Sequence, residues 1–139
     1  MKFIALYALT LIAPIQGLLL IAGLAVLMDT IFAVYYSVKT AGWDSFKSTK
    51  LFNVVVKTFF YFGTIIFAYF IDTHVVSNNT ILGVNLLIAK LTTIFWIYIE
   101  VKSIDETSVK MGNPSFYAVV KKLMGRLKDL KKDINEIVK

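Results

Sequence analysis

The sequence contains no cysteine, and His74 is the only histidine among its 139 residues. Without cysteine the chain can form neither a disulfide framework nor a thiolate metal site, and it offers no thiol nucleophile. A single histidine also argues against a zinc site. Charged residues make up only 17% of the chain, whereas hydrophobic residues make up 58%. These proportions are typical of a membrane protein, because soluble domains are less apolar and more highly charged.

Recognisable catalytic patterns are lacking as well. The Ser and Asp residues do not pair a nucleophile with a base, and there is no glycine-rich phosphate loop. We therefore expect no enzymatic activity and no cofactor. The net charge of +6 does not indicate a nucleic-acid partner, because the lysines lie in two groups beside apolar runs. At such places the expected partner is the anionic surface of a membrane.

The first apolar region contains no Asp, Glu, Lys or Arg from Phe3 to Met28, which exceeds the roughly 20 residues that cross a bilayer. A helix over the whole region is too long for one span and too short for two spans with a turn, so we place the first span at residues 15–38. Residues 1–14 are predicted to form an interfacial or re-entrant segment that ends at Pro14. We expect this segment to be retained, because no cleavage site opens into a polar domain.

Two more apolar segments predict spans at residues 51–71 and 81–101, which completes a membrane domain at 15–101. Trp96 and Tyr98 near the end of the third span suggest an interfacial aromatic belt. The loop at residues 72–80 has no Lys or Arg, whereas the first loop and the tail contain many. By the positive-inside rule, this multi-pass protein has its N-terminus outside and its C-terminus in the cytoplasm.

Residues 102–139 form a basic cytoplasmic tail with a predicted helix at 114–139, for which Asn113 can serve as the cap and Pro114 as the first residue. Apolar residues recur along this helix at alternating spacings of three and four. They are Val120, Leu123, Leu127, Leu130, Ile134 and Ile137. Such a seam predicts a short coiled coil that joins copies of the chain. The alternative is a helix that lies on the membrane surface or packs against the rest of the chain.

Four ionisable residues interrupt the apolar segments: Asp29, Lys57, Lys90 and Glu100. A charge at mid-bilayer costs at least about 2.5–3.5 kcal/mol, so each should be paired, lie near an interface or face water. Asp29 and Lys57 lie at depths that allow an ion pair. Lys90 lies deepest in its span and should face water or a carboxylate. Glu100 is expected at the cytoplasmic interface, paired with a lysine of the first loop.

Ala25 and Ala33 lie four residues before and after Asp29, on the same face of the first span. Small residues at this spacing let helices approach closely, so this face is predicted to pack against another helix rather than lipid.

The residues "YIEVKSIDET", from Tyr98 to Thr107, resemble a pattern of the phage holin family, the toxin-secretion and phage-lysis holins. The residues that match this pattern are Glu100, Ser103, Ile104 and Glu106. Asp29 with Ala33, and Ser48 and Lys50 with Lys57, match the family further upstream. The resemblance extends from Leu24 to Leu130. The chain departs from the family at Ala33, where glycine is usual, at Asn53, where a small residue is usual, and at Thr107, where asparagine is usual.

The resemblance implies a small pore-forming protein of the bacterial host cytoplasmic (inner) membrane. Such a protein associates with itself and opens lesions that let a cell-wall hydrolase, an endolysin, reach the peptidoglycan during host lysis. Its partners would be membrane lipid, other copies of itself and that hydrolase. The alternative is a non-lytic oligomeric membrane scaffold or virion membrane component that recruits a partner through its C-terminal helix. The predicted fold is all-α, with about three transmembrane helices and an amphipathic cytoplasmic helix.

Overall fold

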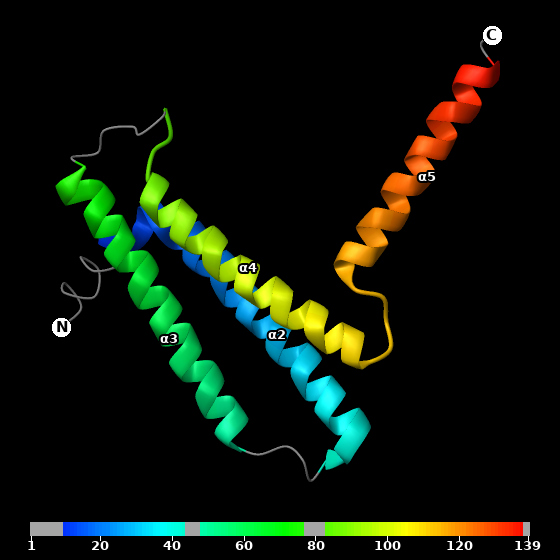
Figure 1. The fold of residues 1–139 in the computed structure, drawn as a ribbon. Helices are drawn as coiled ribbons and strands as arrows, with labels where there is room; N and C mark the ends of the chain where they lie inside the picture. Colours follow the sequence, from blue (N-terminus) through cyan, green and yellow to red (C-terminus); the bar gives the residue numbers. More distant parts are fainter. Residues whose placement is uncertain (1–9, 44–47, 77–82, 138–139) are drawn as a thin grey trace. The chain divides into compact units, whose positions relative to one another are not determined.

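The computed structural model describes residues 10–43, 48–76 and 83–137, except for the side chains of residues 48–51 and 132–137. This part of the chain is all-α (Figure 1). Its four helices are α2 (Gln16–Ala41), α3 (Ser48–Phe70), α4 (Leu87–Lys110) and α5 (Phe116–Ile137). A 3-10 turn precedes α2 at Ala13–Ile15, and a π-helical turn follows α3 at Ile71–Val75. The chain divides into two compact units, Met1–Ile104 and Asp105–Lys139.

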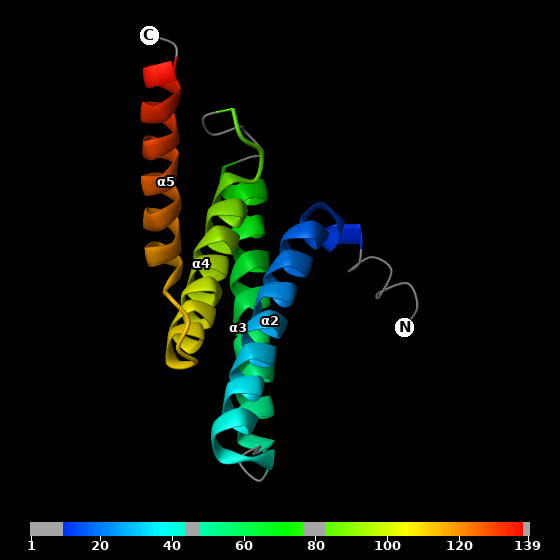
Figure 2. The same cartoon turned by 90° about the vertical axis from the view of Figure 1, so that its right-hand side faces the viewer.

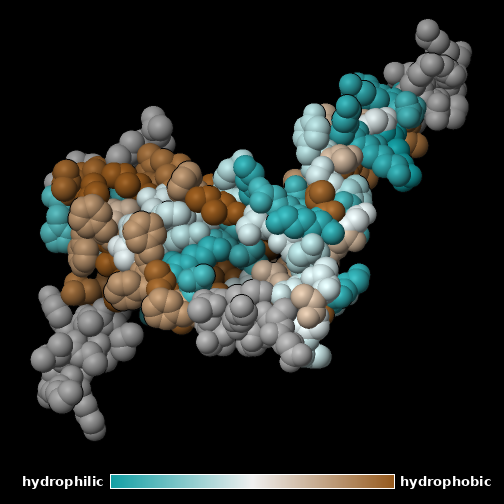
Figure 3. Space-filling view, turned by 60° about the horizontal axis from the view of Figure 1, so that its bottom comes forward, coloured by the Kyte–Doolittle hydropathy of each residue, from teal (hydrophilic) through white to brown (hydrophobic). Residues whose placement is uncertain are grey.

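In the first unit, α2, α3 and α4 run side by side, and successive helices are antiparallel (Figures 1 and 2). The core is small and centres on Ile15, Ala22 and Ile65, which are almost completely buried. Many large apolar side chains point outward instead, with Phe59 81% exposed. On the face in Figure 3, hydrophobic residues gather over this unit, whereas hydrophilic residues predominate on α5. An apolar surface of this extent requires an apolar solvent or a protein partner.

Two helical stretches are long and apolar enough to cross a membrane, Thr10–Ala41 and Phe52–Val75. The described part of α4 does not qualify, because Lys90, Glu100 and Lys102 interrupt its apolar sequence. The structure thus confirms an all-α chain with two apolar candidate spans, while a third transmembrane helix stays a prediction.

Pro14 does not end a separate helix, as the sequence suggested. Helical structure extends from Thr10 through the 3-10 turn Ala13–Ile15 into α2, and residues 1–9 of the predicted segment lie outside the described part. Pro lacks an N–H donor, but a local 3-10 adjustment lets the neighbouring backbone groups find partners. Pro14 therefore tightens the helix instead of interrupting it.

The helix that corresponds to the third predicted span has other bounds than the sequence suggested. Residues 81 and 82 lie outside the described part, α4 begins at Leu87, and it extends to Lys110, beyond the expected end at Val101. Gly112, with φ 91°, follows the end of α4. Its N–H bonds to the Val109 carbonyl at 2.9 Å, in a left-handed ending that favours glycine.

Helix α5 begins two residues later than the predicted start at Pro114. The Ser115 hydroxyl accepts a hydrogen bond from the Ala118 N–H at 3.2 Å, and the Phe116 N–H donates to the Asp105 carboxylate at 2.6 Å. Ser115, rather than Asn113, therefore caps the helix, since its side chain reaches the free N–H of the first turn.

Candidate functional site

Residues on the inward faces of the packed helices recur at the spacing of one helical face. In α2 the buried residues Ala22, Val26 and Asp29 are separated by four and three positions, so they lie on one face. In α3, Lys57 and the buried Tyr61 are four positions apart. Polar groups thus occupy positions on the inward faces that apolar residues would otherwise fill.

Asp29, Lys57 and Glu100 come from three different helices and lie at one level. Asp29 and Glu100 each lie thirteen residues after the first residue of their helices, and Lys57 lies thirteen residues before the last residue of α3. At the helical rise this is about 20 Å from the first residues of α2 and α4 and from the last residue of α3. Because successive helices are antiparallel, these equal distances bring the three side chains together.

The ammonium group of Lys57 bridges the two carboxylates. Lys57 Nζ donates to Asp29 Oδ2 at 3.1 Å and to Glu100 Oε2 at 2.6 Å. The hydroxyl of Tyr61 donates to the other oxygen of Glu100, Oε1, at 2.6 Å. The Glu100 side chain is 1% exposed, that of Asp29 12% and that of Lys57 30%. We call these four residues the ionic cluster.

The ionic cluster is not electrically balanced. With both carboxylates ionised, it holds two negative charges and one positive charge. Asp29 Oδ1 is buried and has no hydrogen-bond partner among the described residues. An uncompensated charge or unsatisfied oxygen in a low-dielectric interior is costly, so the cluster raises the free energy of this closed arrangement. It favours any state in which water or another donor reaches Asp29.

Aromatic side chains hold Tyr61 in place. Trp96 of α4 stacks on its ring with centroids 4.1 Å apart, and the Trp96 indole N–H donates to the Thr64 hydroxyl at 2.8 Å. The ring of Phe60 packs edge-on against Trp96, with the ring centroids 5.6 Å apart. Trp96 therefore belongs to the contact between α3 and α4, while its place in an interfacial belt stays a prediction.

The sequence prediction for Glu100 is corrected in two respects. Glu100 lies within the continuous helix α4 and is completely buried among the helices instead of at the end of a helix. Its cationic partner is Lys57 of α3 and not a lysine of the first loop. The Asp29–Lys57 pair, which the depths of the two residues allowed, is present.

Lys90 stands apart from the ionic cluster. Because α4 begins at Leu87, Lys90 lies in its first turn, close to the end of the helix and not deep within it. Its side chain is exposed on the described structure. A lysine at such a position can extend its ammonium group toward the membrane interface.

The remaining predicted residues are distributed over several environments. Ala25 is half-buried and Ala33 is exposed, so α2 packs within the chain through Ala22 and Val26 instead. In the family pattern, Ser103 and Ile104 are half-buried and Glu106 is exposed.

Along the apolar seam of α5, the described side chains are exposed or half-buried. Leu123, Leu127 and Leu130 are exposed and Val120 is half-buried, while the side chains of Ile134 and Ile137 lie outside the described part.

Sequence reasoning missed Tyr61 and Asp72. Asp72 is 4% exposed and accepts hydrogen bonds from the backbone N–H groups of Ile88 at 3.2 Å and Ala89 at 2.8 Å. It thereby caps the start of α4 from the end of another helix, where a negative charge is favoured. The sequence contained a signal for both residues, because positions 57, 61, 65, 68 and 72 lie on one helical face.

Comparison with known proteins identifies a family for this chain. The sequence model of the bacteriophage holin family matches residues 7–132, which is most of the chain. No curated protein and no solved structure matches significantly.

Proposed function

Because the chain belongs to the bacteriophage holin family, we propose that it oligomerises in the bacterial cytoplasmic membrane and opens lesions through which a cell-wall hydrolase reaches the peptidoglycan. Family membership implies a non-enzymatic membrane protein with a role in host lysis. The match over residues 7–132 is the observation that carries the proposal, since it includes both apolar candidate spans in full.

We place α4 in the membrane as a third span beside α2 and α3. Its interruption by Glu100 does not prevent this, because that carboxylate is turned inward onto Lys57 and Tyr61. Polar groups in spanning helices are tolerated when they face the bundle and are paired. Three spans, with the basic first loop and tail in the cytoplasm, place the N-terminus outside.

The ionic cluster supports a mechanism for the lesion. In the closed chain, Lys57 shields the two carboxylates from lipid, but it does not neutralise both. When copies associate and the helices separate, water can hydrate Asp29 and Glu100, which removes the cost of burying them. The same groups then provide a polar lining that lipid cannot easily seal. The exposed Ala33 on α2 offers a place where another copy can approach closely.

Induced expression in a bacterium that also makes a cytoplasmic cell-wall hydrolase tests the proposal, with culture turbidity and membrane potential followed together. We expect an abrupt, delayed loss of both, and no loss of turbidity when either protein is omitted. The variant Glu100→Gln, which keeps an acceptor for Tyr61 but removes a charge, should change the time of onset. Continued growth with the protein inserted in the membrane would favour the non-lytic scaffold instead.

A further inference from the structure

Helix α5 has a broad apolar surface that no described residue of its own unit covers. The exposed fractions are 65% for Phe116, 54% for Leu123, 56% for Met124, 65% for Leu127 and 57% for Leu130. At about 100° per residue these positions fall on one side of the helix. Their arc extends beyond the predicted seam on one side, because it also includes Met124. A surface that only paired two helices would need the narrower stripe.

Most charges on α5 are arranged around this apolar arc, while Lys131 falls within it. Arg126 and Lys122 border one edge, and Lys121 and Lys128 border the other, as their positions on the helix place them. Asp129 lies on the opposite, polar face. Cations at the border and an acid furthest from the apolar face are typical of a helix in the plane of an anionic bilayer. There the lysine and arginine stems lie along the apolar region while their charges reach the phosphates.

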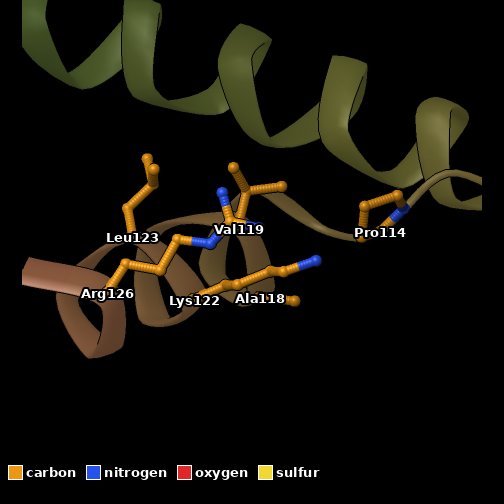
Figure 4. Close-up of a pocket in the computed structure, with 6 residues that line it drawn as sticks. All are labelled: Pro114, Ala118, Val119, Lys122, Leu123 and Arg126. Atoms are coloured by element: carbon orange, nitrogen blue, oxygen red, sulfur yellow. The ribbon is translucent and has the colours of Figure 1, made fainter. Parts of the chain in front are cut away.

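A shallow groove on α5 brings the two kinds of group together. Its apolar walls include Ala118, Val119 and Leu123, and Lys122 and Arg126 line the same groove (Figure 4). Lys122 and Arg126 are one helical turn apart, so both can contact neighbouring anionic oxygens. Ammonium and guanidinium groups beside apolar walls match a phospholipid, whose phosphate and acyl chain are joined in one molecule.

Pairing between copies is less compatible with these charges. If Val120 and Leu123 are core positions of a heptad, Arg126 and Lys131 take the flanking positions that face one another in a parallel pair. Two cations would then be opposed across the interface. A negatively charged bilayer attracts both.

We propose that α5 lies in the plane of the cytoplasmic membrane surface, with its apolar arc in the headgroup region and its bordering cations on anionic phospholipids. This binding depends on the chain being in a membrane but not on lesion formation. It can therefore fail or succeed independently of the lytic function.

The full-length protein can be tested in vesicles, because its lack of cysteine allows a single labelled position. An environment-sensitive fluorophore is attached to Leu127→Cys, and the matched control is Gly125→Cys on the opposite face. A Cβ at Gly125 meets no atom within 4 Å, so the control is sterically tolerated. The vesicles contain either phosphatidylcholine alone or phosphatidylcholine with about 30% phosphatidylglycerol, each with and without a lipid-attached quencher.

We expect the label at position 127 to be quenched by lipid in anionic vesicles and much less in neutral ones, and the label at position 125 in neither. Adding Lys122→Gln and Arg126→Gln should lower the equilibrium constant for surface binding roughly 25-fold, because each cation contributes about fivefold. Equal quenching in neutral and anionic vesicles would overturn the proposal. So would a label at 127 that is shielded from water and from the lipid quencher, which indicates a coiled coil, or one that stays in water throughout.

Discussion

Removing the cation of the ionic cluster should destabilise the bundle more than removing all of its charges. Lys57→Met leaves Asp29 and Glu100 buried without the group that bridges them at 3.1 and 2.6 Å. Breaking a buried ion pair by deleting one partner typically costs about 3–5 kcal/mol, because the other charge is left uncompensated. With Glu100 1% exposed, we expect a loss within this range for the single variant.

The matched control is the triple variant Asp29→Leu, Lys57→Met and Glu100→Gln, in which Gln still accepts the bond from Tyr61. Replacing a whole buried ionic group by neutral residues is often close to neutral in stability, so the triple variant should recover most of the loss. Reversible unfolding in detergent micelles with increasing SDS, followed by circular dichroism, gives the free energy of unfolding of each variant. The reasoning is wrong if Lys57→Met lies within about 1 kcal/mol of the unmodified chain, or if the triple variant is no more stable than the single one.

Three further predictions concern neighbouring features. Tyr61→Phe should lower the free energy of unfolding by about 1–3 kcal/mol in the same assay, since Glu100 Oε1 loses its donor, whereas Tyr98→Phe at an exposed position should have little effect. Asp72→Ala should cost about 0.5–2 kcal/mol by uncapping α4, and Asp72→Asn should retain much of that stability; equal losses would argue against the cap. Ser77→Cys, outside the described residues, should react with an impermeant thiol reagent added to intact cells, and labelling only after cell disruption would invert the proposed topology.

The sequence predicted the features that depend on composition and depth along a helix. The apolar runs identified the helices, and the depths of Asp29 and Lys57 from the lysine-rich loops allowed their ion pair. These properties depend on the rise per residue, which is nearly constant in helices. The basic, amphipathic character of α5 was also predicted from its own sequence, because the pattern of apolar and charged residues on one helix does not depend on its contacts with other helices.

Glu100 could not be placed in the same way. Its neighbours Ile99 and Val101 and the nearby Lys102 suggested an interfacial position, but its environment depends on how far α4 continues and which face it turns toward α3. A charged residue inside a packed bundle requires partners from other helices, and sequence proximity does not reveal them. The contact of Trp96 was missed for the same reason, because its position near a span end did not show that it stacks on Tyr61.

The start of α4 shows how a contact between distant residues decides a local boundary. Leu86 takes φ 54°, an unusual value for a leucine, immediately before the helix begins. Asp72, in the π-helical turn, supplies the acceptors for the first N–H groups of α4. No residue next to Leu87 signals this start, so the apolar run alone predicted a helix that began too early.

The most direct test of the account is whether water reaches the ionic cluster when the lesion opens. Val26→Cys places a thiol on the buried face of α2, one turn before Asp29, at a position that is 1% exposed. In cells expressing this variant, a small impermeant thiol reagent should leave it unmodified before the loss of membrane potential and label it afterwards. The control is Phe59→Cys, since Phe59 is 81% exposed on the outer face of α3. This variant should remain unlabelled at both times. Labelling of Phe59→Cys but not Val26→Cys after the potential collapses would contradict the claim that these helices separate to line the lesion.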